Sequence, residues 1–171
     1  EEFSALTQSQ FCVSCHQVAV HPGIKLEVVW DQFLNSPAHT TGKSCQDCHM
    51  PDVSGEACAP GFDGAFRTDL PAHDLNGANS WVLNAILDLD QSLLLYGPSE
   101  VSGMNAADVA AAVQRNISML ERASELELSL DGDRLSVRIY NDTGHKLPTG
   151  YGEGRRMWIN VQFRDSAGVL V

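Results

Sequence analysis

Apolar and polar residues follow two different periods along this chain. Residues 26–34 place their apolar side chains along one stripe of an α-helix, and Pro37 is expected to end that helix. Two longer helical patterns follow over residues 80–96 and 106–120, with Asn105 as the expected N-cap of the second. Because a short connection joins them, we expect these two helices to pack as an antiparallel pair.

From residue 125 the apolar positions alternate with polar ones, which is typical of β-strands. Residues 125–130 and 135–139 alternate on either side of the turn sequence at 131–133, so they predict an antiparallel hairpin. Residues 157–163 predict a third strand, and residues 168–171 begin a fourth. Three or four strands of this kind are the beginning of a β-sandwich and not a complete one.

The predicted fold class is therefore α+β, in two parts. Residues 1–124 form a mostly irregular and helical region that ends with the helical pair, and residues 125–171 form an antiparallel, incomplete immunoglobulin-like β segment. Within the first part, residues 52–79 are rich in glycine, proline and aspartate, which predicts irregular chain.

Composition and charge narrow the class of protein. The chain has 171 residues, of which 43% are hydrophobic, so it can bury a core. Its net charge of -11 argues against nucleic acid and anionic membrane surfaces as partners, since both select basic patches. No apolar run approaches the roughly 20 residues that span a bilayer. The first residues, Glu1-Glu2-Phe3, do not resemble a signal peptide, so we expect a mature form.

Four of the five cysteines belong to a pentapeptide that occurs twice, in which two cysteines are separated by two residues and followed by a histidine. This is the attachment pattern for c-type haem: the thiols bond the haem vinyl groups, and the histidine becomes the proximal ligand of the iron. We predict two covalent haems c, each with its iron, on the following residues: Cys12, Cys15 and His16 for the first, and Cys45, Cys48 and His49 for the second.

Two other uses of these cysteines are less consistent with the spacing. A structural zinc site of four thiolates gives no reason for a histidine after each pair. A redox-active disulfide would be expected within a βαβ pattern, which this region lacks. The fifth cysteine, Cys58, can be a buried apolar residue, an intermolecular disulfide partner or a reactive thiol, and the first reading is favoured.

Three segments resemble the multihaem c-type cytochromes, including the pentahaem nitrite reductase. They are residues 30–51 around the second haem motif, residues 71–79 with His73, and residues 141–156 with His145. The resemblance implies an electron-transfer protein in which His73 is a distal haem ligand. Because haem is attached outside the cytoplasm, we also expect a periplasmic or extracellular protein whose signal peptide has been cleaved.

Each iron has a sixth position to fill. A second histidine gives a low-potential electron carrier, whereas a methionine raises the potential. We rank His73 first as a distal ligand, then His39 and His145, and then His21, and no methionine is well placed. The neighbouring Arg155 and Arg156 are candidates to pair with haem propionates, or else they are solvated residues at a strand edge.

The leading prediction for function is electron transfer through two bis-histidine haems. The alternative is a haem enzyme, such as a nitrite or hydroxylamine reductase or a peroxidase, with one open iron below Arg67 or His21. A third reading is a structural piece of a larger haem chain. Expected partners are other redox proteins or copies of this chain, in an oligomer or filament in which His145 is donated in trans. The competing explanation is that the natural chain continues past Val171 and completes the sandwich itself.

Overall fold

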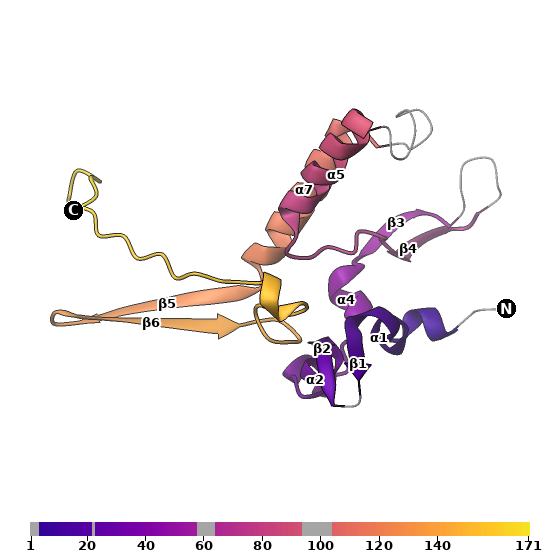
Figure 1. Cartoon of the computed structure of the whole chain (residues 1–171), viewed down its shortest axis with the longest axis horizontal. Coiled ribbons are helices and arrows are strands. Elements are labelled where there is room, and N and C mark those ends of the chain that lie inside the picture. Colours follow the sequence, from indigo (N-terminus) through magenta and orange to yellow (C-terminus); the bar gives the residue numbers. More distant parts are fainter. Residues whose placement is uncertain (1–3, 22, 58–63, 94–103) are drawn as a thin grey trace.

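The computed structural model describes residues 4–21, 23–57, 64–93 and 104–171. Cys58, Tyr96 and the expected end of the first long helix therefore lie outside the described residues. The described part is mixed α/β, with short helices and two-stranded antiparallel sheets (Figure 1). Its helical elements are η1 (Ser4–Thr7), α1 (Gln10–His16), α2 (Val29–Leu34), α3 (Pro37–Thr40), α4 (Cys45–His49), α5 (Ser80–Leu93), α7 (Ala106–Glu121) and η2 (Gly152–Gly154). Its strands are β1 (Gln17–His21), β2 (Ile24–Val28), β3 (Asp52–Glu56), β4 (Phe66–Pro71), β5 (Ser124–Asp131) and β6 (Arg134–Asn141).

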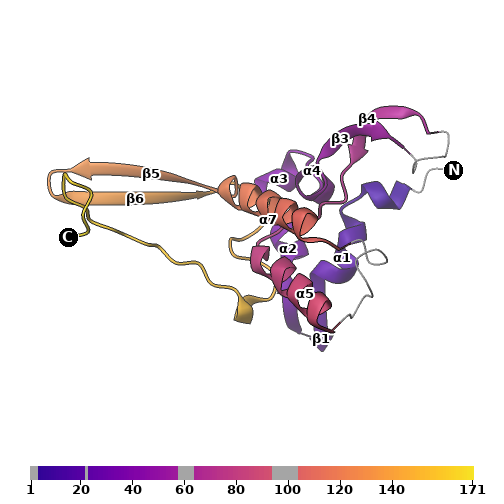
Figure 2. The same ribbon diagram turned by 90° about the horizontal axis from the view of Figure 1, so that it is seen from above.

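The two long helices, α5 and α7, lie side by side as expected from the sequence (Figures 1 and 2). The side chain of Asn105 accepts a hydrogen bond from the amide of Asp108 (2.9 Å), which confirms the predicted cap. Asn116, buried on α7, accepts a hydrogen bond from the amide of Gly77 (3.0 Å). The helical pair therefore holds the segment that leads out of β4.

The helix predicted over residues 26–34 is wrong at its start. Leu26 belongs to β2, which pairs with β1, and α2 begins only at Val29. Pro37 does not simply end this helix but takes the first position of α3, where Ser36 accepts a hydrogen bond from the amide of His39. Pairing with β1, a contact between separate segments, decided the conformation of residues 24–28.

The prediction of irregular chain over residues 52–79 is also wrong in part. β3 and β4 pair antiparallel within this segment, with Asp52 opposite Pro71 and Glu56 opposite Phe66. Cross-strand hydrogen bonding stabilises this hairpin despite the glycine and aspartate, which have low β propensity.

The β segment forms only its first hairpin as a regular sheet. β5 and β6 pair antiparallel about the predicted turn, with Leu126 opposite Ile139 and Gly132 at the turn with a φ of 60°. Residues 157–163 and 168–171 form no strand in the described structure, apart from one bridge between Arg164 and Leu170. The predicted sandwich is thus present as a two-stranded ribbon that extends away from the helices (Figures 1 and 2).

The protein part of the molecule buries few apolar side chains. Among the described residues these are Phe33, Leu87 and Val109. The chain exposes 13083 Å², whereas a compact monomer of 18.6 kDa exposes about 8,200 Å². Much of the apolar surface is therefore available to contact something other than this polypeptide. None of the described helices has the length and apolarity that crossing a bilayer requires.

Candidate haem-binding centre

The two cysteine motifs lie on two short helices that adjoin, α1 and α4. The hydroxyl of Ser9, which is buried, accepts a hydrogen bond from the amide of Cys45 (3.0 Å). The side-chain amide of Gln46 donates to the carbonyls of Leu6 (2.9 Å) and Gln8 (3.0 Å). Segments far apart in the sequence are thus fixed together at the start of both motifs.

The first cysteines of the two motifs also meet. The pKa of the Cys12 thiol is raised, first by burial and then by the proximity and hydrogen bond of Cys45, with Cys15 also contributing. All four motif thiols are free. The first thiols of the two motifs are therefore neighbours.

The second motif begins with a capping box that the sequence analysis did not use. The Ser44 hydroxyl accepts a hydrogen bond from the amide of Asp47 (3.2 Å), and the Asp47 carboxylate accepts one from the amide of Ser44 (2.7 Å). The signal for it was present, because a serine followed three residues later by an acidic residue is typical of a helix start. The capping box fixes the turn that carries Cys45, Cys48 and His49.

His49 and His145 face each other. Their ring centroids are 6.3 Å apart, and the ring planes differ by 19°. His49 ends α4, whereas His145 lies on the loop after β6, so the pairing joins distant parts of one chain. The sequence left open whether His145 serves its own chain or a neighbour, and this structure places it beside His49 of its own chain.

The outer nitrogens of both rings are held by backbone carbonyls. Nδ1 of His49 lies 2.5 Å from the carbonyl oxygen of Asn76, and Nδ1 of His145 lies 3.0 Å from that of Lys146. A carbonyl only accepts, so each Nδ1 must carry the proton and donate it. Each Nε2 is then left with a lone pair, which is the arrangement that metal-binding histidines adopt.

The spacing of the two rings fits one iron between them. An imidazole nitrogen binds a transition-metal ion at about 2.0–2.1 Å, and the ring centre lies roughly 1 Å behind it. Two imidazoles on opposite faces of one ion therefore have ring centres about 6 Å apart, which agrees with the 6.3 Å observed. The distance between the two ring centres is therefore that expected for an iron that would be held by His49 and His145.

Burial keeps His49 in the required neutral form. Its pKa is lowered, first by burial, while the hydrogen bond to Asn76 raises it and the nearby His145 and His16 lower it. A neutral imidazole is the form that binds a metal ion.

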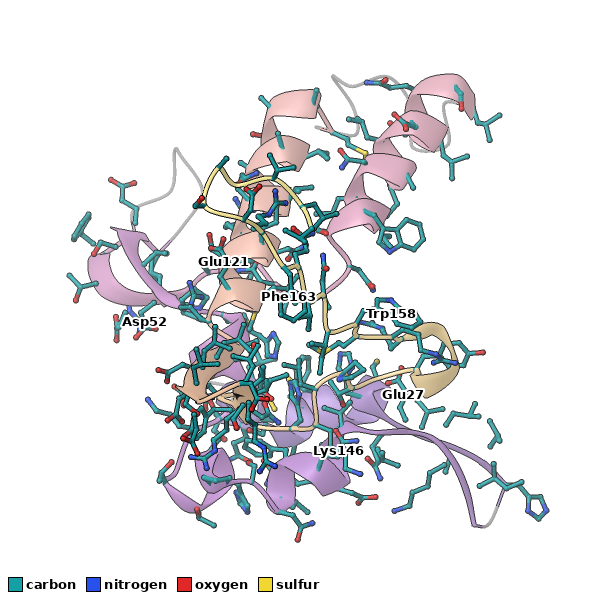
Figure 3. The ribbon with its side chains drawn as sticks, turned by 90° about the vertical axis from the view of Figure 1, so that its left-hand side faces the viewer. Glu27, Asp52, Glu121, Lys146, Trp158 and Phe163 are labelled. Carbon is teal, nitrogen blue, oxygen red and sulfur yellow. The ribbon has the colours of Figure 1, made fainter. Side chains whose placement is uncertain are left out.

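The loop that carries His145 is fixed to α2 and α3. The amide of Lys146 and the hydroxyl of Thr149 both donate to the side-chain carbonyl of Gln32, at 3.1 and 2.6 Å. Figure 3 shows Lys146 on this loop, above the purple N-terminal helices. Gly144 lies so close that an added Cβ would be 3.2 Å from the Ala38 Cβ and 3.3 Å from the Phe33 ring.

This close approach predicts that Gly144→Ala will displace the loop. The new methyl group would meet a buried ring and a backbone-fixed Cβ, and overpacking of this kind costs about 1–3 kcal/mol. We expect a lower melting temperature and a fraction of high-spin ferric haem in the absorption spectrum. The matched control is Gly152→Ala, because a Cβ at Gly152 meets nothing within 4 Å. Equal behaviour of the two variants would contradict the assigned role of Gly144.

The proximal histidine of the first motif has a different neighbour. Nδ1 of His16 lies 3.9 Å from a carboxylate oxygen of Glu27 on β2. Among the other predicted ligands, His39 lies on α3 with its ring 5.3 Å from that of Phe33. His21 ends β1 and His73 follows β4, and both are exposed. The described contacts therefore place His145 beside His49 and show no candidate distal histidine beside His16.

The two predicted propionate ligands, Arg155 and Arg156, line a pocket of about 390 Å³. The side chain of Arg156 donates to the carbonyls of Gly152 (2.9 Å) and Arg155 (2.8 Å). Both arginines follow the loop of His145, so they are positioned by the same segment. The pocket walls are completed by Leu26, Val28, Gln32, Pro148, Thr149, Gly150 and Gly152.

Across the described residues, which include the four motif cysteines, no three histidine, cysteine, aspartate or glutamate side chains gather as metal ligands. An iron held by a porphyrin would need only two axial protein ligands, which His49 and His145 could supply.

Comparison with known proteins identified no relative: no family model, curated protein or solved structure matches this chain. The assignment therefore depends on the residues themselves. Sequence reasoning missed Asn76, Gln32 and Glu27. Asn76 contributes a backbone carbonyl, for which no side-chain signal exists. Gln32 acquires its role through a contact with Thr149, 117 residues away, and Glu27 meets His16 through the register of the β1–β2 hairpin.

Proposed function

We propose that this protein transfers electrons through two covalently attached c-type haems. The observation that carries the proposal is the facing pair of His49 and His145, with ring centres 6.3 Å apart and both Nδ1 atoms held by carbonyls. When bound, haem supplies an iron that exchanges one electron without a change of ligands. A site closed on both faces by imidazole suits an electron carrier and not an enzyme.

The chain's own residues have three tasks in this proposal. The cysteine pairs Cys12/Cys15 and Cys45/Cys48 hold the two groups covalently at adjoining points. His16 and His49 bind from the proximal side, and His145 binds opposite His49. For the first haem the candidate distal ligands remain His73 and His39, followed by His21. Arg155 and Arg156 are proposed to neutralise propionates, because guanidinium groups pair well with carboxylates.

The paucity of buried apolar side chains supports the same proposal. Few described side chains are buried, and large apolar residues such as Phe11 and Val53 stay exposed near the two motifs. A porphyrin is a large apolar surface, and burying it against such side chains stabilises the fold by about 25 cal/mol per Å². The haems would thus supply much of the core that the polypeptide lacks.

Location and partners follow from the cofactor. Because haem is attached outside the cytoplasm, we propose a periplasmic or extracellular protein. Its partners would be other one-electron redox proteins or copies of itself. The ribbon of β5 and β6 supports self-association, because one face exposes six aliphatic side chains: Leu126, Leu128, Leu130, Leu135, Val137 and Ile139. A filament, and a distal histidine donated in trans, remain predictions.

The test is the haem content and ferric spectrum of the protein produced with haem attachment machinery. We expect two haems per chain by mass spectrometry and by the haemochrome assay, and a fully low-spin spectrum at neutral pH. A second histidine on each iron forces the low-spin state, so a high-spin component would favour the enzyme alternative. A protein that binds zinc in place of haem would overturn the proposal.

A further inference from the structure

The two proximal histidines differ in the groups that face their outer nitrogens. His49 points Nδ1 at the neutral carbonyl of Asn76 at 2.5 Å. His16 points Nδ1 at the carboxylate of Glu27 at 3.9 Å. The partner of the outer nitrogen tunes the basicity of a metal-bound histidine and, through it, the metal. The two sites are therefore electrostatically unequal.

We propose that Glu27 is a positioning residue that lowers the reduction potential of the first haem below that of the second. The inference rests on the proposed function, since it requires haem at both motifs. Reduction adds one electron to an iron and moves no proton, so the ferric state carries one more positive charge. A carboxylate beside the proximal imidazole stabilises that extra charge. An electron shared between the sites is then held mainly at the site of His49 and His145.

The strand β2 directs the Glu27 side chain toward His16. Successive residues of a strand point to opposite faces, and the neighbours Leu26 and Val28 line the arginine pocket on the other face. Glu27 pairs with Val18 of β1, the strand that directly follows His16, so the register brings the carboxylate to the histidine. The contact is thus built into the hairpin.

The negative charge of Glu27 is not neutralised by an ion pair with Lys25, the cation nearest to it in the sequence. Lys25, two residues before it, forms its ion pair with Asp31 of α2. The Glu27 side chain is only 23% exposed, compared with 50% for Lys25. Partial burial of the carboxylate reduces screening by water on its side of the pair, whereas the His16 ring is 66% exposed and is screened more.

The distance indicates an effect of charge and not of a formed hydrogen bond. At 3.9 Å the pair is too long for a hydrogen bond. By contrast, the neutral carbonyl of Asn76 accepts a short hydrogen bond from His49 but carries no net charge. Removing the Glu27 charge while keeping its shape should therefore affect the first haem and leave the second nearly unchanged.

The experiment measures each haem's potential in the full chain carrying both haems. Paramagnetic NMR follows the two haems separately during a redox titration, and the signals that change in His145→Ala are assigned to the second haem. In Glu27→Gln we expect the ferrous-to-ferric ratio of the first haem, at a fixed applied potential, to rise about tenfold, which is 59 mV for one electron. The ratio at the second haem should change less than about twofold.

Two further variants make the test specific. Asp133→Asn removes one carboxylate charge at the far turn of the ribbon and should leave both ratios unchanged (Figure 1). Glu27→Asp keeps the charge but withdraws it by one methylene, so a smaller rise at the first haem is expected. If Glu27→Gln does not retain the first haem, Glu27→Asp alone tests whether Glu27 lowers the potential of that haem. Glu27 is labelled in Figure 3.

Failure of this inference differs from failure of the proposed function. If the unsubstituted chain does not carry two haems, the proposed function is wrong. If it carries two haems and neither Glu27 variant changes the first potential, or both haems shift equally, Glu27 has no tuning role and electron transfer itself is unaffected.

Discussion

Replacing His145 with alanine is expected to convert one of the two ferric haems from low-spin to high-spin. The ring centres of His145 and His49 are 6.3 Å apart, and removing His145 would leave the iron proposed at His49 with five ligands. Because each chain would carry two haems, about half of the total ferric haem should become high-spin. Absorption and electron paramagnetic resonance spectra at neutral pH measure that fraction.

Two comparisons test whether the high-spin fraction in His145→Ala arises from loss of the His49–His145 pair. His21→Ala is the matched control, since His21 lies at the end of β1 and ranks last among the candidate ligands. That variant should keep a fully low-spin spectrum. Diluting the unsubstituted protein to nanomolar concentration tests whether His145 comes from the same chain. A ligand from the same chain stays bound on dilution, so the spectrum should remain low-spin. If His145→Ala remains low-spin throughout, the assignment of His145 is wrong.

Removing both haems is expected to abolish cooperative folding. A quadruple variant, with alanine in place of Cys12, Cys15, Cys45 and Cys48, cannot attach haem covalently. Its polypeptide would have to fold with few buried apolar side chains and a surface of 13083 Å². Since folding must offset about 1–2 kcal/mol of backbone entropy per residue, this burial is insufficient for the haem-binding part.

Circular dichroism and calorimetry provide the measurement for the haem-free variant. We expect no sharp thermal transition and strong binding of a hydrophobic dye, whereas the haem-loaded protein should melt cooperatively. The pair of α5 and α7 is expected to keep part of its helical signal, because local propensity and the Asn105 cap favour it. A cooperative transition in the haem-free variant would show that the polypeptide core is sufficient by itself.

The sequence by itself determined the features that depend on neighbours along the chain. The two haem motifs are contiguous pentapeptides, so their chemistry can be recognised without a fold. The long helices and the ribbon of β5 and β6 have sustained periods of 3.6 and 2, and the structure has both. The capping box of Ser44 and Asp47 was equally readable, although the sequence analysis did not use it.

The tertiary structure decided the contacts that join separate segments. The period of residues 26–34 indicated a helix, but pairing with β1 made residues 24–28 a strand. Four histidines were candidate distal ligands, and only the docking of the Gly144 loop on Phe33 brought His145 to His49. Likewise, Glu27 meets His16 only because the hairpin register places it there. Such contacts depend on packing in three dimensions, which the spacing of residues along the chain does not encode locally.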